Sequence, residues 1–255
     1  MKIAISVAVA LVISLSTFAQ VKIHSHNDYL QGKPFYTALE NRVYEMEADI
    51  FVRNDSIFVA HSEREIHPSR TLSNMYLNPI AREFELHKNR VSSDKKYNFS
   101  LMIDVKEKWE DVYPVLKAEI EKYGGIFDRN KSKLAVQIVI SGSRPAPNTF
   151  QDYPKWLFFD GLPNVAYTKK ELERIAIISD RFASHSKWRG QGTIPQADIP
   201  KIQKVIDIAI SYNKPVRFWG APDTKTCWKQ LATLGADVIN TDKIKETKDF
   251  FENEL

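Results

Sequence analysis

The sequence predicts an α/β protein, a single-domain (β/α)8 TIM barrel. Short apolar segments rich in Val, Ile, Phe and Met alternate with longer amphipathic segments to the end of the chain. This is the order expected of parallel strands joined by helices. Eight such apolar segments fit into the 255 residues, which matches the strand number and typical size of a TIM barrel. A doubly wound open sheet is the alternative.

The eight predicted strands are short and rich in β-branched and aromatic residues. They cover residues 21–25, 43–51, 98–106, 134–141, 156–161, 175–182, 215–219 and 236–240. Apolar residues spaced by three and four predict helices over 110–125 and 199–213. The segment 62–97 is longer than a barrel connection requires, and we expect a helix around 73–88 together with an irregular active-site loop.

The first residues have the layout of a secretory signal peptide, because an early lysine is followed by an apolar stretch and the small-residue pattern Thr17-Phe18-Ala19. We therefore expect residues 1–19 to be a signal peptide and 20–255 to form the domain of a secreted or periplasmic protein. No later window approaches the roughly 18 consecutive apolar residues of a spanning helix, so we expect no transmembrane segment.

The composition narrows the possible partners. The formal net charge is +4, and acids and bases are mixed along the chain, which gives no basic stripe for nucleic acid. Cys227 is the single cysteine, so no intramolecular disulfide can form and the fold depends on its core. The two common glycine-rich phosphate-binding motifs are absent. The oligomeric state is not indicated.

Acidic residues are concentrated at the ends of two predicted strands. In "EMEADIF" the side chains of Glu45, Glu47 and Asp49 share one face of the strand, and Asp104 ends the next apolar strand. Carboxylates crowded at the mouth of a barrel repel one another unless a cation lies between them. We therefore predict a Mg²⁺ or Ca²⁺ site made by Glu47, Asp49 and Asp104. Pairing with lysine or arginine is the alternative.

Two histidines are expected at the same level. His26 follows the first strand, and His61 follows the strand-like "SIFVAH". They can act as an acid/base pair on either side of a reacting phosphate. Alternatively, the "HSH" motif that contains His24 can bind zinc. If it does not bind metal, His24 is expected to support the site from inside the first strand. We expect no function for the remaining histidines, His67, His87 and His185.

These residues together resemble the PLC-like phosphodiesterase superfamily, which includes glycerophosphodiester phosphodiesterases, and in particular its sphingomyelinase D-like and AIM6-like branch. The superfamily carries a histidine after strand one, Glu-x-Asp at the end of strand two and a second histidine shortly after. Here these elements correspond to His26, Glu47-Ala48-Asp49 and His61. Asp104 matches the third metal carboxylate, and the opening "HSHNDY" is typical of the AIM6-like branch.

The resemblance implies a phosphodiesterase that uses a divalent metal and two-histidine acid/base catalysis. It also implies four substrate-binding residues: Asn27, Lys106, Trp219 and Asn240. Capping of the last helix is an equally plausible role for Asn240. A substrate hydroxyl that attacks phosphorus would give a cyclic phosphate, and attack by water would give a simple hydrolysis product.

The sequence departs from the glycerophosphodiester phosphodiesterases at three points. Asn27 replaces the arginine that follows their first histidine, Ser62 replaces the aspartate that follows the second, and the interval between His61 and Asp104 is too short for their small inserted domain. The substrate is therefore left as a glycerophosphodiester or a phospholipid-type phosphodiester. A zinc-dependent amidohydrolase-like barrel and a catalytically inactive secreted binding protein are the alternatives.

Overall fold

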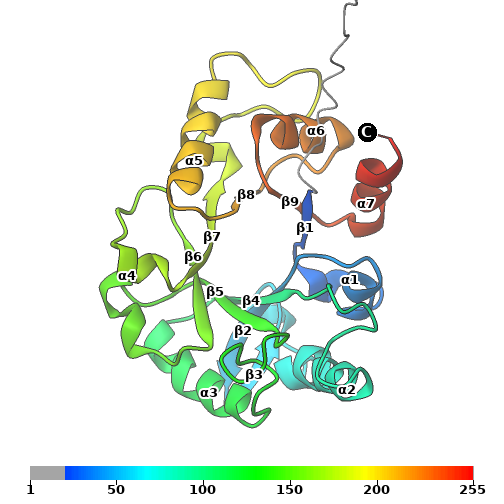
Figure 1. The fold of residues 1–255 in the computed structure, drawn as a ribbon, viewed down its shortest axis with the longest axis vertical. Helices are drawn as coiled ribbons and strands as arrows, with labels where there is room; N and C mark the ends of the chain where they lie inside the picture. The colour runs from blue at the N-terminus through cyan, green and yellow to red at the C-terminus, as the bar shows by residue number, and fades with distance from the viewer. Residues whose placement is uncertain (1–20, 255) are drawn as a thin grey trace, which may run out of the picture.

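Eight parallel strands close into a barrel in the computed structural model, which describes residues 21–254 (Figure 1). The barrel strands are β1 (Lys22–Ser25), β2 (Glu45–Arg53), β4 (Ser100–Val105), β5 (Gln137–Gly142), β6 (Leu157–Gly161), β7 (Ile175–Arg181), β8 (Val216–Trp219) and β9 (Val238–Thr241). Each pairs in parallel with its neighbours, and β1 closes the ring by pairing with both β2 and β9. The prediction of a TIM barrel is therefore confirmed.

The helices surround the barrel (Figure 1). The α-helices are α1 (Tyr36–Glu40), α2 (Asn78–Leu86), α3 (Trp109–Glu121), α4 (Lys169–Leu172), α5 (Ile199–Ser211), α6 (Lys225–Leu234) and α7 (Ile244–Asn253). Short 3₁₀ turns lie at 28–30, 63–65, 147–152 and 182–184, and a π-helical turn, Ser73–Leu77, leads into α2. The predicted helices over 73–88, 110–125 and 199–213 are thus present with slightly different ends. The predicted signal peptide, 1–19, lies outside the described residues.

One strand does not belong to the barrel. β3 (Ser56–Val59) pairs antiparallel with the upper half of β2, after a tight turn in which Asn54 and Asp55 both have positive φ, as two-residue hairpins require. The sequence predicted a strand before His61 but not its direction. Because the chain turns back, the backbone N–H of Ala60 reaches the carbonyl of Asp49, and His61 follows at that level.

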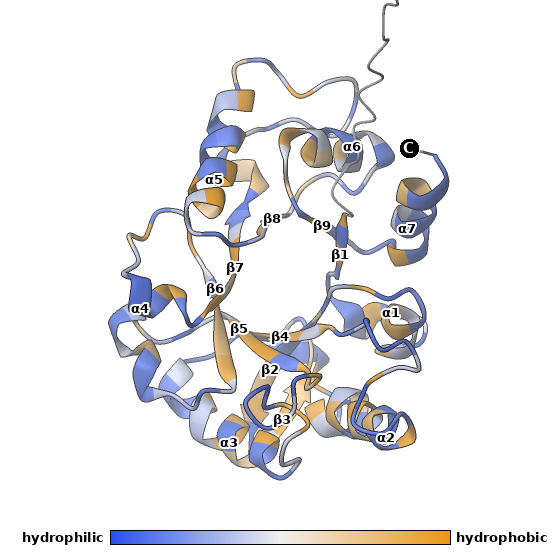
Figure 2. Cartoon of the chain, in the orientation of Figure 1, coloured by the Kyte–Doolittle hydropathy of each residue, from blue (hydrophilic) through white to orange (hydrophobic). Residues whose placement is uncertain are grey.

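The core has two parts. The larger part lies between the barrel and the helices, where apolar residues of the strands and of helices such as α3 and α5 are buried. Figure 2 shows hydrophobic and hydrophilic residues alternating along these helices. A small apolar cluster fills the lower interior of the barrel: Met102, Val139, Ile177 and Val238. Two residues further along each of these strands, the next inward-facing side chain is polar: Asp104, Ser141, Ser179 and Asn240. The interior of the barrel therefore changes from apolar to polar toward the carboxyl ends of the strands, where TIM barrels carry their sites. Within residues 21–254, no helix has the length and apolar character to cross a membrane.

Candidate active site

Three carboxylates meet near the carboxyl end of β4 and the part of β2 that pairs with it. Asp49 and Asp104 are register partners on these adjacent strands, and Glu47 lies on the same face of β2 as Asp49. One ligand oxygen of each lies within 4.8 Å of those of the others, and this is the only such group of three or more metal-ligating side chains among residues 21–254. The three residues predicted from the sequence as metal ligands are thus brought together.

The carboxylate cluster has free coordinating capacity. Asp49 Oδ1 and Asp104 Oδ1 are buried and receive no hydrogen bond from the described residues, an arrangement that costs free energy unless a cation or donor satisfies them. Burial and the nearby charge of Glu47 raise the pKa of Asp49. A hard divalent cation with oxygen ligands would satisfy the two buried oxygens and offset the crowded negative charge. These residues therefore fit Mg²⁺ or Ca²⁺.

Lys106 lies beside the cluster and partly balances its charge. Its Nζ is 2.7 Å from Asp104 Oδ2 and 2.9 Å from Asp49 Oδ2. The side chain stays partly exposed, so the ammonium group also faces the mouth of the barrel. The pairing of the acids with a lysine, which the sequence left open, is therefore present at Asp49 and Asp104, and it leaves the other oxygen of each carboxylate free.

The two predicted histidines both lie beside the cluster, after strands that pair with the edge of β2 opposite β4. His26 Nδ1 is 2.8 Å from Asp242 Oδ1, and His61 Nδ1 is 3.1 Å from Asp49 Oδ2. In both rings Nε2 has no hydrogen-bond partner within residues 21–254. Burial lowers the pKa of His26, but the hydrogen bond to Asp242 and the charge of Glu47 outweigh it, and the net pKa is raised.

Asp242 is itself held in place by the loop after β8. Asp223 Oδ2 accepts a hydrogen bond of 3.0 Å from the backbone N–H of Asp242, and its Oδ1 accepts from Thr241 and Trp228. Sequence reasoning missed Asp242, although it ends the "GADVINTD" segment. It lies 216 residues from His26 in the chain, so no local spacing could indicate the contact.

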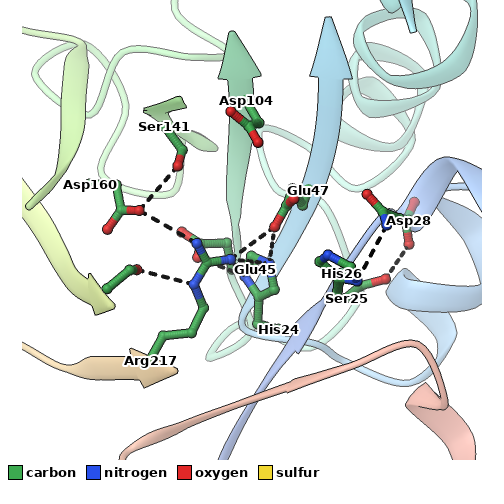
Figure 3. A network of polar contacts seen from close by, with 12 residues as sticks. His24, Ser25, His26, Asp28, Glu45, Glu47, Asp104, Ser141, Asp160 and Arg217 are labelled. Atoms are coloured by element: carbon green, nitrogen blue, oxygen red, sulfur yellow. Dashed lines mark hydrogen bonds and ion pairs between the residues drawn. The ribbon is translucent and has the colours of Figure 1, made fainter. Parts of the chain in front are cut away.

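A buried ionic network lies directly beneath the carboxylate cluster (Figure 3). Arg217 reaches from β8 across the barrel, and its Nη1 donates to Glu47 Oε2 at 2.9 Å while Nη2 lies 3.4 Å from Asp160 Oδ2. His24 lies between Glu45 and Glu47, at 2.9 and 2.6 Å. These five side chains are buried, and the network fixes the carboxylate of Glu47 from below.

The network keeps Glu47 ionised although it is buried. Burial alone would raise the pKa of Glu47, but the hydrogen bond from His24 and the charge of Arg217 hold it well below its usual range. Glu47 is therefore ionised and oriented. His24 supports Glu47 rather than joining a zinc-type pair with His26, because both of its ring nitrogens face β2 carboxylates. Arg217 and Asp160, single charges within the apolar strands "PVRFW" and "LFFDG", were missed.

The predicted substrate-binding residues occupy different settings around the mouth. Asn27 adopts a left-handed backbone conformation, and its Oδ1 accepts a 2.8 Å hydrogen bond from Tyr29. The Tyr29 hydroxyl, which has one hydrogen to share, also lies 2.9 Å from Asp49 Oδ2, so Asn27 shapes the loop between His26 and the carboxylates. Trp219, at the end of β8, is 42% exposed.

Asn240 does not cap the last helix. The cap position of α7 is Lys243, and no side chain makes the capping hydrogen bond there. Asn240 is instead the register partner of His24, and its Oδ1 is buried with no hydrogen-bond donor among residues 21–254. The capping role is therefore wrong. The histidines expected to lack a function lie elsewhere: His185 pairs with Asp180 at 2.7 Å, His87 with Glu83 and His67 with Ser69.

Comparison with known proteins agrees with this geometry. The model of the AIM6-like phosphodiesterase domain matches residues 14–160, and that of the glycerophosphoryl diester phosphodiesterase family matches 215–244. Among curated proteins, "Altered inheritance of mitochondria protein 6 homolog" of Arthroderma benhamiae is 24% identical over 91% of this chain and 84% of its own length. "Altered inheritance of mitochondria protein 6" of Lachancea thermotolerans is 28% identical over 88% of this chain. This chain covers only 64% of that relative.

Solved structures share the fold at low sequence identity. A glycerophosphodiester phosphodiesterase from Parabacteroides distasonis has a TM-score of 0.56 and 14% identity, with 91% of this chain and 97% of that chain covered. A putative glycerophosphoryl diester phosphodiesterase from Silicibacter pomeroyi has a TM-score of 0.54 and 11% identity, with 92% and 94% covered. The fold and the family matches together define a TIM barrel of the glycerophosphodiester phosphodiesterase and PLC-like superfamily. Within it, the chain belongs to the AIM6-like phosphodiesterase domain family.

Proposed function

We propose that the protein is a phosphodiesterase that hydrolyses a glycerophosphodiester or phospholipid-type substrate with a divalent cation held by Glu47, Asp49 and Asp104. One observation carries this proposal: two buried carboxylate oxygens without donors lie in the same site as two histidines whose Nδ1 atoms contact carboxylates and whose Nε2 atoms are unengaged among residues 21–254. When bound, a cation at this place would offset negative charge that builds up on the phosphate. All-oxygen ligands favour Mg²⁺ or Ca²⁺ over Zn²⁺.

The chain supplies the proton transfers and the remaining positive charge. His26 and His61 are the two acid/base groups, one taking the proton of the attacking hydroxyl or water and the other protonating the leaving oxygen. Each is oriented through Nδ1 by a carboxylate, Asp242 or Asp49. Lys106 contributes a cation beside the phosphate position, and Asn27 holds the loop that carries His26.

Substrate groups beyond the phosphate would contact Trp219 and Asn240. The exposed ring of Trp219 supports an apolar contact at the mouth, and the amide of Asn240 projects from β9 into the barrel. A secreted or periplasmic location is part of the same proposal and depends on the signal peptide predicted over residues 1–19.

The experiment that tests this function is hydrolysis of bis(p-nitrophenyl) phosphate after treatment with EDTA and after addition of Mg²⁺, Ca²⁺ or Zn²⁺. We expect Mg²⁺ or Ca²⁺ to restore activity. Restoration by Zn²⁺ alone would favour the zinc hydrolase alternative. An absence of hydrolysis with every metal, repeated with glycerophosphodiester and phospholipid substrates, would favour a catalytically inactive binding protein.

Gly142 gives a second test of the carboxylate site. It has a φ of +68°, and a Cβ at this position would lie 2.0 Å from Asp104 Oδ1 and 2.5 Å from the backbone oxygen of Val105. Gly142→Ala must therefore displace the Asp104 side chain, the backbone at Val105 or residue 142 itself, and each of these shifts disturbs the carboxylate site. We expect the affinity for Mg²⁺ or Ca²⁺, measured as the metal concentration at half-maximal hydrolysis, to fall by about 10- to 100-fold, as for changes beside a metal ligand.

Gly124→Ala is the matched control for this substitution. Gly124 has nearly the same φ, +63°, and nothing lies within 4 Å of a Cβ placed there. Both variants therefore carry the backbone penalty for a left-handed residue, about 1–2 kcal/mol, and only one disturbs the carboxylate site. Equal metal affinities in the two variants would contradict the role of Asp104.

A further inference from the structure

The wall of the barrel mouth opposite the carboxylates is aromatic and basic. In the ring order β1-β2-β4-β5-β6-β7-β8-β9, the β7–β8 pair lies across the barrel from the β2–β4 pair that carries the acids. Arg181 and Trp219, the last residues of β7 and β8, are register partners. They share the inward face of Ser179 and Arg217, and the guanidinium of Arg181 lies over the Trp219 ring, 5.6 Å from its centre.

A cleft of about 410 Å³ is lined by the segments that directly follow these two residues in the chain. One side is the loop after β7, with Phe182, Lys187, Trp188 and Arg189, and the other is the loop after β8, residues 220–224. Arg181, Lys187 and Arg189 form what we call the basic cluster. All three are exposed, and the segment 181–189 contains no acidic residue.

The nearby acids form no ion pairs with the basic cluster, and one of them, Asp223, lines the cleft. Asp180 pairs with His185 at 2.7 Å, and Asp198 pairs with Lys201 at 2.7 Å. Asp223 accepts hydrogen bonds from the neutral donors Trp228, Thr241 and Asp242, so it offsets only one of the three positive charges. Within the described part of the chain, no ion pair involves a member of the basic cluster. Three cations beside an aromatic ring at a barrel mouth favour an anionic ligand group.

The loop that carries the cluster is held in one position. A Cβ on Gly190 would lie 2.9 Å from Pro222 Cβ, so the two sides of the cleft pack tightly at this point. Gln230 on α6 accepts from the backbone N–H of Ile194 at 2.7 Å and donates to the carbonyl of Gly192 at 3.0 Å. Ordering the loop therefore costs little when a ligand binds, which increases affinity.

We propose that the cleft between the loops after β7 and β8 is a subsite for a second anionic group of the substrate, a phosphomonoester attached to the substituent of the scissile phosphodiester. The inference rests on the proposed function, since it places the scissile phosphate at the carboxylates and the substituent across the mouth. Arg181 and Trp219 bind the start of the substituent, and Lys187 and Arg189 bind its terminal phosphate. The substrate class is thus a phosphodiester that carries a further phosphate.

The test compares two ligands that differ only in this group, glycerophosphoinositol and glycerophosphoinositol 4-phosphate. Binding is measured by isothermal titration calorimetry with Mg²⁺ present, in the His26→Ala variant so that cleavage is slow compared with the titration. We expect the phosphorylated ligand to bind at least about tenfold more tightly, because charge-assisted hydrogen bonds to a guanidinium are strong. Adding Arg181→Gln and Arg189→Gln should bring the two dissociation constants together.

The matched control removes two exposed cations elsewhere. Lys133→Gln with Lys204→Gln causes the same loss of charge outside the cleft and should keep the preference. Equal binding of the two ligands to the starting protein, or no binding of either, would overturn the proposal. So would cosedimentation with phosphatidylglycerol vesicles that depends on Arg181 and Arg189 without any preference between the soluble ligands, because the cluster would then serve a lipid surface.

Failure of this inference can be told apart from failure of the proposed function. Metal-dependent hydrolysis of bis(p-nitrophenyl) phosphate without a preference for the phosphorylated ligand would remove the subsite alone. A clear preference in a protein that hydrolyses no phosphodiester would keep the subsite and remove the catalytic function.

Discussion

Replacing Arg217 with methionine should lower the free energy of unfolding by about 3–5 kcal/mol, the usual cost of removing one partner from a buried ion pair. Arg217 is 3% exposed and lies between Glu47 and Asp160, which are also buried. Without the guanidinium these carboxylates lose their cation while they stay out of water, and burial already raises the pKa of Asp160. The loss is measured by urea denaturation in EDTA, so that no bound metal compensates.

Arg53→Met is the matched control for this prediction. Arg53 also contacts two carboxylates, those of Glu63 and Glu107, but all three side chains are partly exposed. Exposed ion pairs contribute about 0–1 kcal/mol, so a small change is expected. A similarly small change for Arg217→Met would show that the network does not hold buried charge. Adding Glu47→Gln to Arg217→Met should recover part of the loss, because one of the stranded charges is then absent.

His26→Ala should reduce the turnover of bis(p-nitrophenyl) phosphate by about 10²- to 10⁴-fold, the usual contribution of a positioned acid/base group. The folding of the protein should change little, because the side chain is 31% exposed and its partner Asp242 is 63% exposed. Asp242→Asn should reduce turnover less, since His26 stays in place and loses only the carboxylate that orients its ring.

His185→Ala is the control for the loss of a histidine. His185 also contacts an aspartate, Asp180, at 2.7 Å. Asp180 lies between Ser179 and Arg181 in β7, and because these two face inward, the side chain of Asp180 faces outward. Its replacement should leave turnover unchanged. Full activity in the His26→Ala variant would remove His26 from the mechanism, whatever the effect at His185.

Much of the fold could be predicted because the barrel strands carry local signals. Each strand is a short apolar run, and the two-residue alternation in "EMEADIF" identifies which side chains face the interior of the barrel. The antiparallel direction of β3 was not predicted. The turn residues Asn54 and Asp55 signal a hairpin, and this signal would have placed His61 back beside Asp49 instead of at the end of a barrel strand.

The candidate site was only half predictable, for a physical reason. Asp104 lies next to the end of its strand, and Glu47 and Asp49 share one face of β2, so the sequence indicates their level in the barrel. The partners of these residues come from distant parts of the chain: Arg217 lies 170 residues from Glu47, and Asp242 lies 216 residues from His26. A single charge within an apolar strand, such as Arg217 or Asp160, indicates a buried ion pair, but the partner is defined only when the barrel closes.

The most direct measurement is the metal dependence of bis(p-nitrophenyl) phosphate hydrolysis by the wild-type protein and the Asp104→Asn variant. Asp104 is suited to this test because it is less buried than Glu47 and does not contact Arg217, so its replacement spares the buried network. The account predicts wild-type activity that EDTA removes and Mg²⁺ or Ca²⁺ restores, and little restored activity in the variant. Equal activity of both proteins in EDTA would contradict a carboxylate-bound metal as the centre of this site.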